Sequence, residues 1–184
     1  GLRGNIHHAA GELQRAESLY KRKLDVCERT RNQVERSRAL GNIGLVCFAQ
    51  HRNDDALEYF LQVETVCEKN GDVDGLQRAL GNIGNVYARR NDDAAALEQY
   101  ERQERLCRDT GNTSGLLTAI GCQGVIHSRR KDFERAVFLY RKQEELCGEL
   151  DDLNGMQMAM GNLGATLLEK GDDGEALDVF LKRQ

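Results

Sequence analysis

The tetrapeptide GNIG at Gly41–Gly44 returns forty residues later at Gly81–Gly84, then as GCQG at Gly121–Gly124 and as GNLG at Gly161–Gly164. A fixed period of about 20 to 50 residues is typical of a solenoid, in which each unit buries its apolar face only by stacking on the next. The recurrence therefore predicts a tandem array that forms one continuous domain. Such an array usually offers an extended binding surface and has no catalytic pocket.

One unit contains two stretches in which apolar residues recur at steps of three and four, over 75–90 and over 94–108. This spacing is that of an amphipathic helix, and we name the first stretch helix A and the second helix B. Asn91-Asp92-Asp93 separates them with short polar residues that favour turns and helix N-caps. Gly111 supplies a residue for a left-handed helix end before the next unit. Helices joined by so short a turn pack antiparallel, so each unit is expected to be a helical hairpin.

The period also sets the expected boundaries. Helix A is predicted at 35–50, 75–90, 115–130 and 155–170, and helix B at 12–29, 54–69, 94–109 and 134–149. The units are expected at 1–34 (partial), 35–74, 75–114, 115–154 and 155–184 (partial), within a single domain of residues 1–184. Because the chain begins with Gly and its first unit is entered halfway, it is expected to be a fragment of a longer protein.

Three kinds of residue mark each unit: a glycine at the eighth position of helix A, a small residue early in helix B, and an aromatic residue four places after it. They are Gly44, Gly84, Gly124 and Gly164; Ala16, Ala56, Ala96, Ala136 and Ala176; and Tyr20, Phe60, Tyr100, Tyr140 and Phe180. In these positions the chain resembles the tetratricopeptide repeat (TPR), whose usual unit of about 34 residues ends in Pro. This chain has no Pro and uses longer loops such as 70–75, a form that resembles the repeats of Pins-type adaptors and of bacterial TPR signalling proteins. The resemblance implies an all-α fold, a right-handed α-solenoid of stacked antiparallel helix hairpins.

The two glycines of each GNxG motif have different expected roles. Gly44 and its equivalents are expected to lie against the small Ala of the facing helix B, since a missing Cβ lets two helices approach closely. Gly41 and its equivalents add a second glycine per turn, which costs about 1 kcal/mol of helix propensity relative to Ala. Either close packing between hairpins or access for a ligand must offset this cost, and the sequence leaves both open.

Composition excludes several classes of function. A net charge of −4 gives no general attraction to nucleic acid or anionic lipid. No apolar run of about 18 residues and no signal peptide is present, so no membrane segment is expected. Cys27, Cys67, Cys107 and Cys147 recur at the repeat period, too far apart for disulfides. They are expected to be free, buried thiols of a reducing, cytoplasmic compartment.

No catalytic, metal or cofactor site is expected. Adjacent His7 and His8 point in different directions on a helix, and the cysteines have no close C-x-x-C spacing. The GNxG motif lies inside a helix and follows no strand, so it is not a nucleotide fingerprint. The chain is therefore expected not to be an enzyme.

The other face of helix A is the candidate binding surface, because in tetratricopeptide arrays this stripe lines the concave groove. Asn can bond to a peptide backbone, and Arg can hold a carboxylate in a bidentate pair. The predicted groove residues are Arg38, Asn42, Arg78, Asn82, Asn85, Arg89, Arg129 and Asn162. The alternative for an Arg near a helix C-terminus is that it only complements the helix dipole.

These patterns favour a protein-interaction scaffold that binds a peptide or partner segment, in particular an extended acidic one, along the helix-A groove. Two alternatives stay open. The region could regulate or act as the sensor of a larger signalling enzyme, or it could be a structural array that self-associates through its exposed ends.

Overall fold

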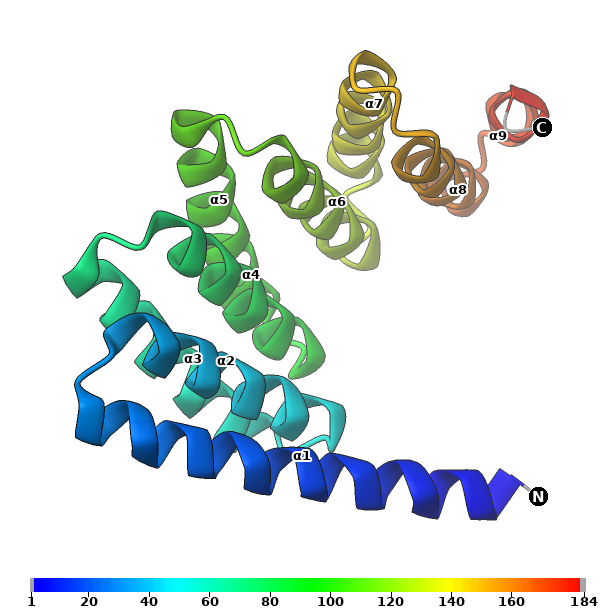
Figure 1. Cartoon of the computed structure of the whole chain (residues 1–184). Coiled ribbons are helices and arrows are strands. Elements are labelled where there is room, and N and C mark those ends of the chain that lie inside the picture. Colours follow the sequence, from blue (N-terminus) through cyan, green and yellow to red (C-terminus); the bar gives the residue numbers. More distant parts are fainter. Residues whose placement is uncertain (1, 183–184) are drawn as a thin grey trace. The chain divides into compact units, whose positions relative to one another are not determined.

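The computed structural model describes the backbone of residues 2–182 and the side chains of residues 11–182. The described residues form nine α-helices and no strand (Figure 1). The helices are α1 (Leu2–Thr30), α2 (Gln33–Ala49), α3 (Asn53–Asn70), α4 (Val73–Arg89), α5 (Asp93–Thr110), α6 (Thr113–Arg129), α7 (Phe133–Glu149), α8 (Leu153–Lys170) and α9 (Asp173–Lys182). From α2 to α8, every predicted boundary is within two residues of the observed one.

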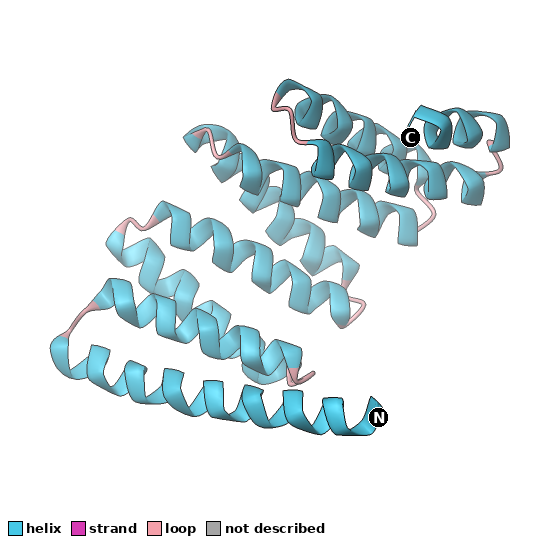
Figure 2. Cartoon of the chain, turned by 45° about the vertical axis from the view of Figure 1, so that its right-hand side comes forward, coloured by secondary structure: helices cyan, strands magenta, loops and turns pink. Residues whose placement is uncertain are grey.

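The chain divides into two compact units, residues 1–92 (unit 1) and 93–184 (unit 2). In unit 1 each helix from α1 to α4 packs against the next, and in unit 2 the same holds from α5 to α9. The connecting loops are short, as the pink segments of Figure 2 show. The all-α class and the stacking of consecutive antiparallel helices are thus confirmed. That the chain is one domain stays a prediction.

The predicted start of the first helix B is wrong. Helix B was expected to begin near residue 12, but α1 runs without a break from Leu2 to Thr30. Gly11-Glu12-Leu13 stands where another unit has Asn91-Asp92-Asp93, and it lacks the short polar side chains that cap a new helix. The helix therefore continues through the position at which another unit has its turn. His7 and His8 lie outside the residues whose side chains are described.

Each turn contains one residue in the left-handed conformation. Gly71 and Gly111 have φ of 66° and 68°, which confirms the glycine predicted for this place. Asx side chains cap the following helix: Asp72 accepts a hydrogen bond from the Gly75 N–H, and Asn112 accepts one from the Gly115 N–H. The turn chemistry thus repeats with the sequence.

The glycine of the tight helix pair meets a different partner from the one expected. A Cβ on Gly44 would lie 2.6 Å from the ring of Phe60, and one on Gly124 would lie 2.7 Å from the ring of Tyr140. The neighbour is thus the aromatic residue of helix B and not the Ala four places before it. Ala56 is fully buried nearby.

The four periodic cysteines are buried, and all six cysteines are free. Burial raises the pKa of the Cys67 thiol to about 11 and also raises the pKa of the Cys107 and Cys147 thiols, which keeps them protonated near neutral pH. Within the part of the chain that was described, no group of three or more metal-ligating side chains comes together. None of the described helices combines the length and apolarity needed to cross a membrane.

Candidate functional site in unit 1

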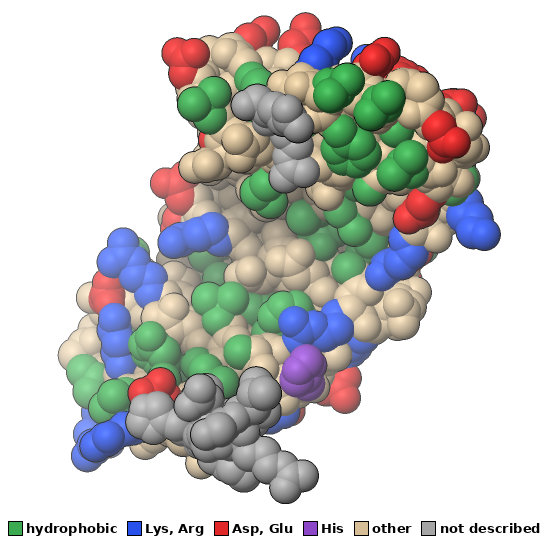
Figure 3. Space-filling view, turned by 90° about the vertical axis from the view of Figure 1, so that its right-hand side faces the viewer, with side chains coloured by type: hydrophobic (Ala, Val, Ile, Leu, Met, Phe, Trp, Pro, Cys, Tyr) green, Lys and Arg blue, Asp and Glu red, His purple; other side chains and the backbone are tan. Residues whose placement is uncertain are grey.

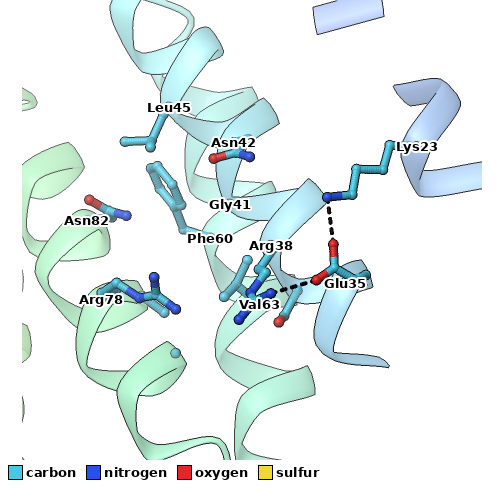
Figure 4. Close-up of a pocket in the computed structure, with 13 residues that line it drawn as sticks. Lys23, Glu35, Arg38, Gly41, Asn42, Leu45, Phe60, Val63, Arg78 and Asn82 are labelled. Carbon is cyan, nitrogen blue, oxygen red and sulfur yellow. Dashed lines mark hydrogen bonds and ion pairs between the residues drawn. The ribbon is translucent and has the colours of Figure 1, made fainter. Parts of the chain in front are cut away.

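A cavity of about 360 Å³ opens between α2 and α4, with α3 behind it (Figure 4). Phe60 and Val63 of α3 form its apolar back wall, and Leu45 of α2 lies at one side. Four of the predicted groove residues line this one cavity: Arg38 and Asn42 from α2, and Arg78 and Asn82 from α4. They meet because positions separated by one repeat lie on the same face of neighbouring A helices, which are in contact.

The two asparagines of the cavity are not used by the fold. Asn42 and Asn82 are half-buried, and neither makes a hydrogen bond to another described residue. A carboxamide offers two N–H donors and an acceptor oxygen. Both side chains are therefore available to an incoming backbone.

The cavity carries an excess of positive charge. Glu35 accepts from both Lys23 and Arg38, each at 2.6 Å. These bonds, first that of Lys23 and then that of Arg38, hold the pKa of the Glu35 carboxyl below its usual value. Arg78 has no carboxylate partner among the described residues, and its Nε donates only to the Asp74 carbonyl at 3.3 Å.

Gly41 also lines the cavity. A Cβ there would meet only Val63 Cγ2, at the ordinary contact distance of 3.9 Å. Packing inside unit 1 therefore does not require this glycine. Of the two roles left open by the sequence, access for a ligand has the stronger support at this position.

The remaining predicted residues lie elsewhere. The Arg89 guanidinium stacks on the Phe48 ring, 3.2 Å from its centroid, and donates to the Phe48 carbonyl. Arg129 is ion-paired with Asp93, and Asn85 is exposed on α4 outside the cavity lining. Asn162 lines two cavities of unit 2, described below. The groove assignment of all eight residues stays a prediction.

Sequence reasoning missed Lys23 and Glu35, the other two charged residues of the cavity lining. Glu35 stands where the later units have Gly75, Gly115 and Gly155. That departure from the repeat was a readable signal, because a charged residue replaces a glycine at a fixed place. The sequence offered no such signal for Lys23, because an exposed Lys on helix B is common in a soluble helix.

Two further cavities lie in unit 2, on the same face of its A helices. The first, of about 410 Å³, is bounded by α6, α7 and α8 and includes Asn162. The second, of about 290 Å³, lies along α6 and α8 and includes Arg129 and Asn162.

Comparison with known proteins agrees with the observed fold. The sequence profile of the tetratricopeptide repeat matches residues 1–69 and 35–109. The chain is similar in structure to BtubC (BKLC) from P. vanneervenii, with a TM-score of 0.87 and 17% identity over 97% of this chain and 74% of that one. It is also similar to the apo form of RapI, with a TM-score of 0.85 and 13% identity over 98% of this chain and 50% of that one. NprR, solved in complex with its cognate peptide NprX, matches with a TM-score of 0.66 and 18% identity over 92% of this chain and 50% of that one. No curated protein matches the sequence.

Proposed function

Since the chain belongs to the tetratricopeptide repeat family, we propose that it is a protein-interaction scaffold whose unit 1 holds an extended acidic peptide in the cavity between α2 and α4. One observation carries the proposal. Asn42, Asn82 and Arg78 line the same cavity, and the described residues give the carboxamides no hydrogen bond and Arg78 no carboxylate. Polar groups that a fold places together and leaves unused favour binding.

Each group has a distinct role in the proposed complex. Asn42 and Asn82 come from equivalent positions of neighbouring A helices, so they bond to the peptide backbone at two successive places. Arg78 takes a carboxylate of the peptide, and the apolar back wall at Phe60 and Val63 receives a neighbouring side chain. The complex of NprR with a peptide supports peptide binding by a fold of this kind.

The test uses short immobilised peptides of random sequence, made as matched pairs that carry either Glu or Gln at the central position. We expect the wild-type chain to bind the Glu member of a pair more tightly. Asn42→Ala together with Asn82→Ala should weaken binding of both members at every salt concentration, because a backbone group left unpaired costs about 1 to 3 kcal/mol. Arg78→Ala should remove only the preference for Glu, and that preference should shrink as salt is added.

Arg22→Ala is the control, because Arg22 is an exposed Arg of α1 outside the cavity lining. It should leave the binding of both peptides unchanged. A wild-type chain with no preference for Glu, or an asparagine double variant that binds like the wild type, contradicts the proposal. The sensor and self-assembly alternatives, and the cytoplasmic location, stay predictions.

A further inference from the structure

The larger cavity of unit 2 is the repeat equivalent of the cavity in unit 1, displaced by 80 residues along the chain. Both have the GNxG glycine at the same place, Gly41 in one and Gly121 in the other. The side chains around it differ: Arg38 corresponds to Thr118, Asn42 to Cys122, Val63 to Gln143 and Arg78 to Met158. The unit 2 cavity therefore has no cation in its lining, and Asp152 is its one charged residue.

A buried acceptor in this lining has no partner. Gln143 is 9% exposed, and its Nε2 donates to the Leu117 carbonyl at 3.1 Å. Its Oε1 is buried and has no hydrogen bond. The carboxamide fits beneath Gly121, where a Cβ would come within 2.7 Å of Nε2 and 3.2 Å of Oε1. Because the last torsion of a Gln side chain is broad, a small rotation lets Oε1 meet a donor that enters over Gly121.

The only charged side chain in the cavity lining is acidic. Asp152 accepts from the Gly155 N–H with one carboxylate oxygen, Oδ1, at 2.9 Å. Further acidic residues, outside the cavity lining, lie in the second half of α7 and in the next turn: Glu144, Glu145, Glu149 and Asp151. The nearest Lys along α7, Lys142, is bonded to Glu104 at 3.0 Å. The one charge in this lining is thus negative, whereas the lining of the unit 1 cavity has an excess of positive charge.

Apolar side chains complete the lining. Met158 is 67% exposed and Val125 is 48% exposed, and both lie at this cavity. An aliphatic stem can cover such side chains while its charged end stays at a polar rim. The lining therefore combines acceptors with an apolar surface and offers no cation that would repel a base.

We infer that the unit 2 cavity binds a basic side chain of a partner peptide, with its stem on Met158 and Val125 and its head donating to Gln143 Oε1 and Asp152. Arginine fits best, because its planar guanidinium donates in several directions at once and so meets two separate acceptors. The inference rests on the proposed function only in taking the helix-A face as the peptide surface. The residues of the unit 1 cavity have no part in it.

The test is a titration with acetylated, amidated glycine peptides that carry one central Arg, observed by NMR of methionine methyl groups labelled with carbon-13. The chain has 3 methionines, of which Met160 is buried and Met158 is exposed in the cavity. We expect the Arg peptide to shift the Met158 methyl signal and to leave that of Met160 in place. Citrulline has nearly the same shape without the charge, and its peptide should bind about tenfold more weakly.

Two variants locate the binding. Gln143→Leu removes the acceptor, and an apolar residue is tolerated at this repeat position, since Val63 occupies it in unit 1. This variant should bind the Arg peptide about tenfold more weakly than the wild type does. Thr118→Arg with Met158→Arg gives the cavity the arginines of unit 1 at two exposed positions. With the Gly121 amide signal as the probe, this double variant should lose the Arg peptide and bind a matched Glu peptide instead.

The outcomes separate this inference from the proposed function. If Asn42→Ala and Asn82→Ala abolish acidic-peptide binding while the Arg peptide still shifts Met158, both stand. If the chain shows no preference for Glu peptides but the Arg peptide binds in unit 2, only the unit 1 proposal fails. The inference is overturned if the Arg and citrulline peptides bind equally, if titration of the Met158 signal shows that a Trp peptide binds more tightly than the Arg peptide, or if the arginine double variant keeps its affinity for Arg. Should Gln143→Leu fail to fold, the citrulline comparison on the wild type still decides.

Discussion

At one place in the repeat, unit 1 packs apolar side chains where unit 2 has a charged network. In unit 1, Leu24 of α1 packs on the cluster that contains the buried Ile43 of α2. Eighty residues later these positions hold Glu104 and Gln123, and the Glu104 carboxylate accepts from Gln123 Nε2 at 2.6 Å. Lys142 of α7 also donates to Glu104, at 3.0 Å. The helix hairpins are alike in both units, so the same backbone accommodates either solution.

The difference teaches which residues set the fold and which are free to vary. The glycine, the alanine and the aromatic residue of the tight helix pair recur in both units and determine how closely helices A and B approach. The side chains beside them change from one unit to the other without changing the hairpin. Chemistry that is particular to this chain is therefore found where the units differ.

The largest expected effect comes from removing the charge of Glu104. Burial raises the pKa of this carboxyl, but hydrogen bonds from Arg108, Gln123 and Lys142 outweigh it and lower the pKa to about 2. Because the pKa is depressed in the folded state, the stabilisation is complete above the unfolded value and is lost as pH falls from about 4.5 toward 2. At neutral pH, Glu104→Gln should cost about 2 to 3 kcal/mol in the free energy of unfolding.

Urea denaturation followed by circular dichroism at pH 7 and at pH 3 measures this effect. The difference between Glu104→Gln and the wild type should shrink at the lower pH. Glu144→Gln is the matched control, since Glu144 holds the same position one repeat later and makes no ion pair or hydrogen bond with the described residues. If both variants lose the same free energy of unfolding, the hydrogen bonds and ion pairs of Glu104 do not add to stability beyond what an unpaired Glu contributes.

The next effect concerns the tight helix pair that both units share. Gly44→Ala places a Cβ 2.6 Å from the buried Phe60 ring, and Gly124→Ala places one 2.7 Å from the Tyr140 ring. Overpacking of this kind costs about 1 to 3 kcal/mol. Both variants should lower the midpoint of urea unfolding by similar amounts. If the midpoint of urea unfolding is unchanged in either variant, contact with the aromatic ring does not explain why that position holds a glycine.

A smaller effect, of opposite sign in the two units, is expected at the first glycine of the motif. In unit 1 Gly41→Ala meets only Val63, at 3.9 Å, so the gain in helix propensity of about 1 kcal/mol should appear as added stability. In unit 2 Gly121→Ala meets the Gln143 carboxamide at 2.7 Å and should destabilise, because moving this buried carboxamide aside breaks its hydrogen bond to the Leu117 carbonyl. Thermal melting of the two variants compares them directly, and shifts of the same sign would contradict the assignment.

Gly41→Ala also bears on binding. The added methyl group projects toward the unit 1 cavity, so the variant should bind the Glu peptides less tightly although it is more stable. If the variant is more stable but its affinity for the Glu peptides is unchanged, the bound peptide does not reach the part of the cavity next to Gly41.

Much of the fold could be predicted from the sequence, because helix periodicity and turn residues act locally. The same rule brought Arg38, Asn42, Arg78 and Asn82 to one cavity, since residues one repeat apart share a face. It did not predict that Arg89 would stack on Phe48, because a helical pattern gives the direction of a side chain and not its partner.

Two failures have other physical causes. The start of helix B at residue 12 was inferred from the period alone, and the local residues lack the capping groups that would begin a new helix there. The partner of Gly44 was inferred from residue size, whereas the aromatic ring of Phe60 reaches further across the helix pair than the Ala side chain does. The orphan acceptor of Gln143 could not be predicted, since it depends on one carbonyl, that of Leu117, in another helix.

The smallest expected effect lies in the turns that precede α4 and α8. Gly71 and Asp151 hold equivalent positions with φ of 66° and 54°, so one unit has a glycine and the other a strained side chain in the same conformation. The left-handed region costs a residue with a Cβ about 1 kcal/mol, and Asp tolerates it better than most. The reciprocal exchange should therefore have opposite results: Gly71→Asp lowers stability and Asp151→Gly raises it, each by somewhat less than about 1 kcal/mol because glycine also adds entropy to the unfolded chain. Urea unfolding of both variants and of the double exchange measures this, and the double exchange should return close to the wild-type value since the sites lie in separate turns. Losses in both single variants would mean that the Asp151 side chain has a stabilising role in its turn that outweighs the backbone strain.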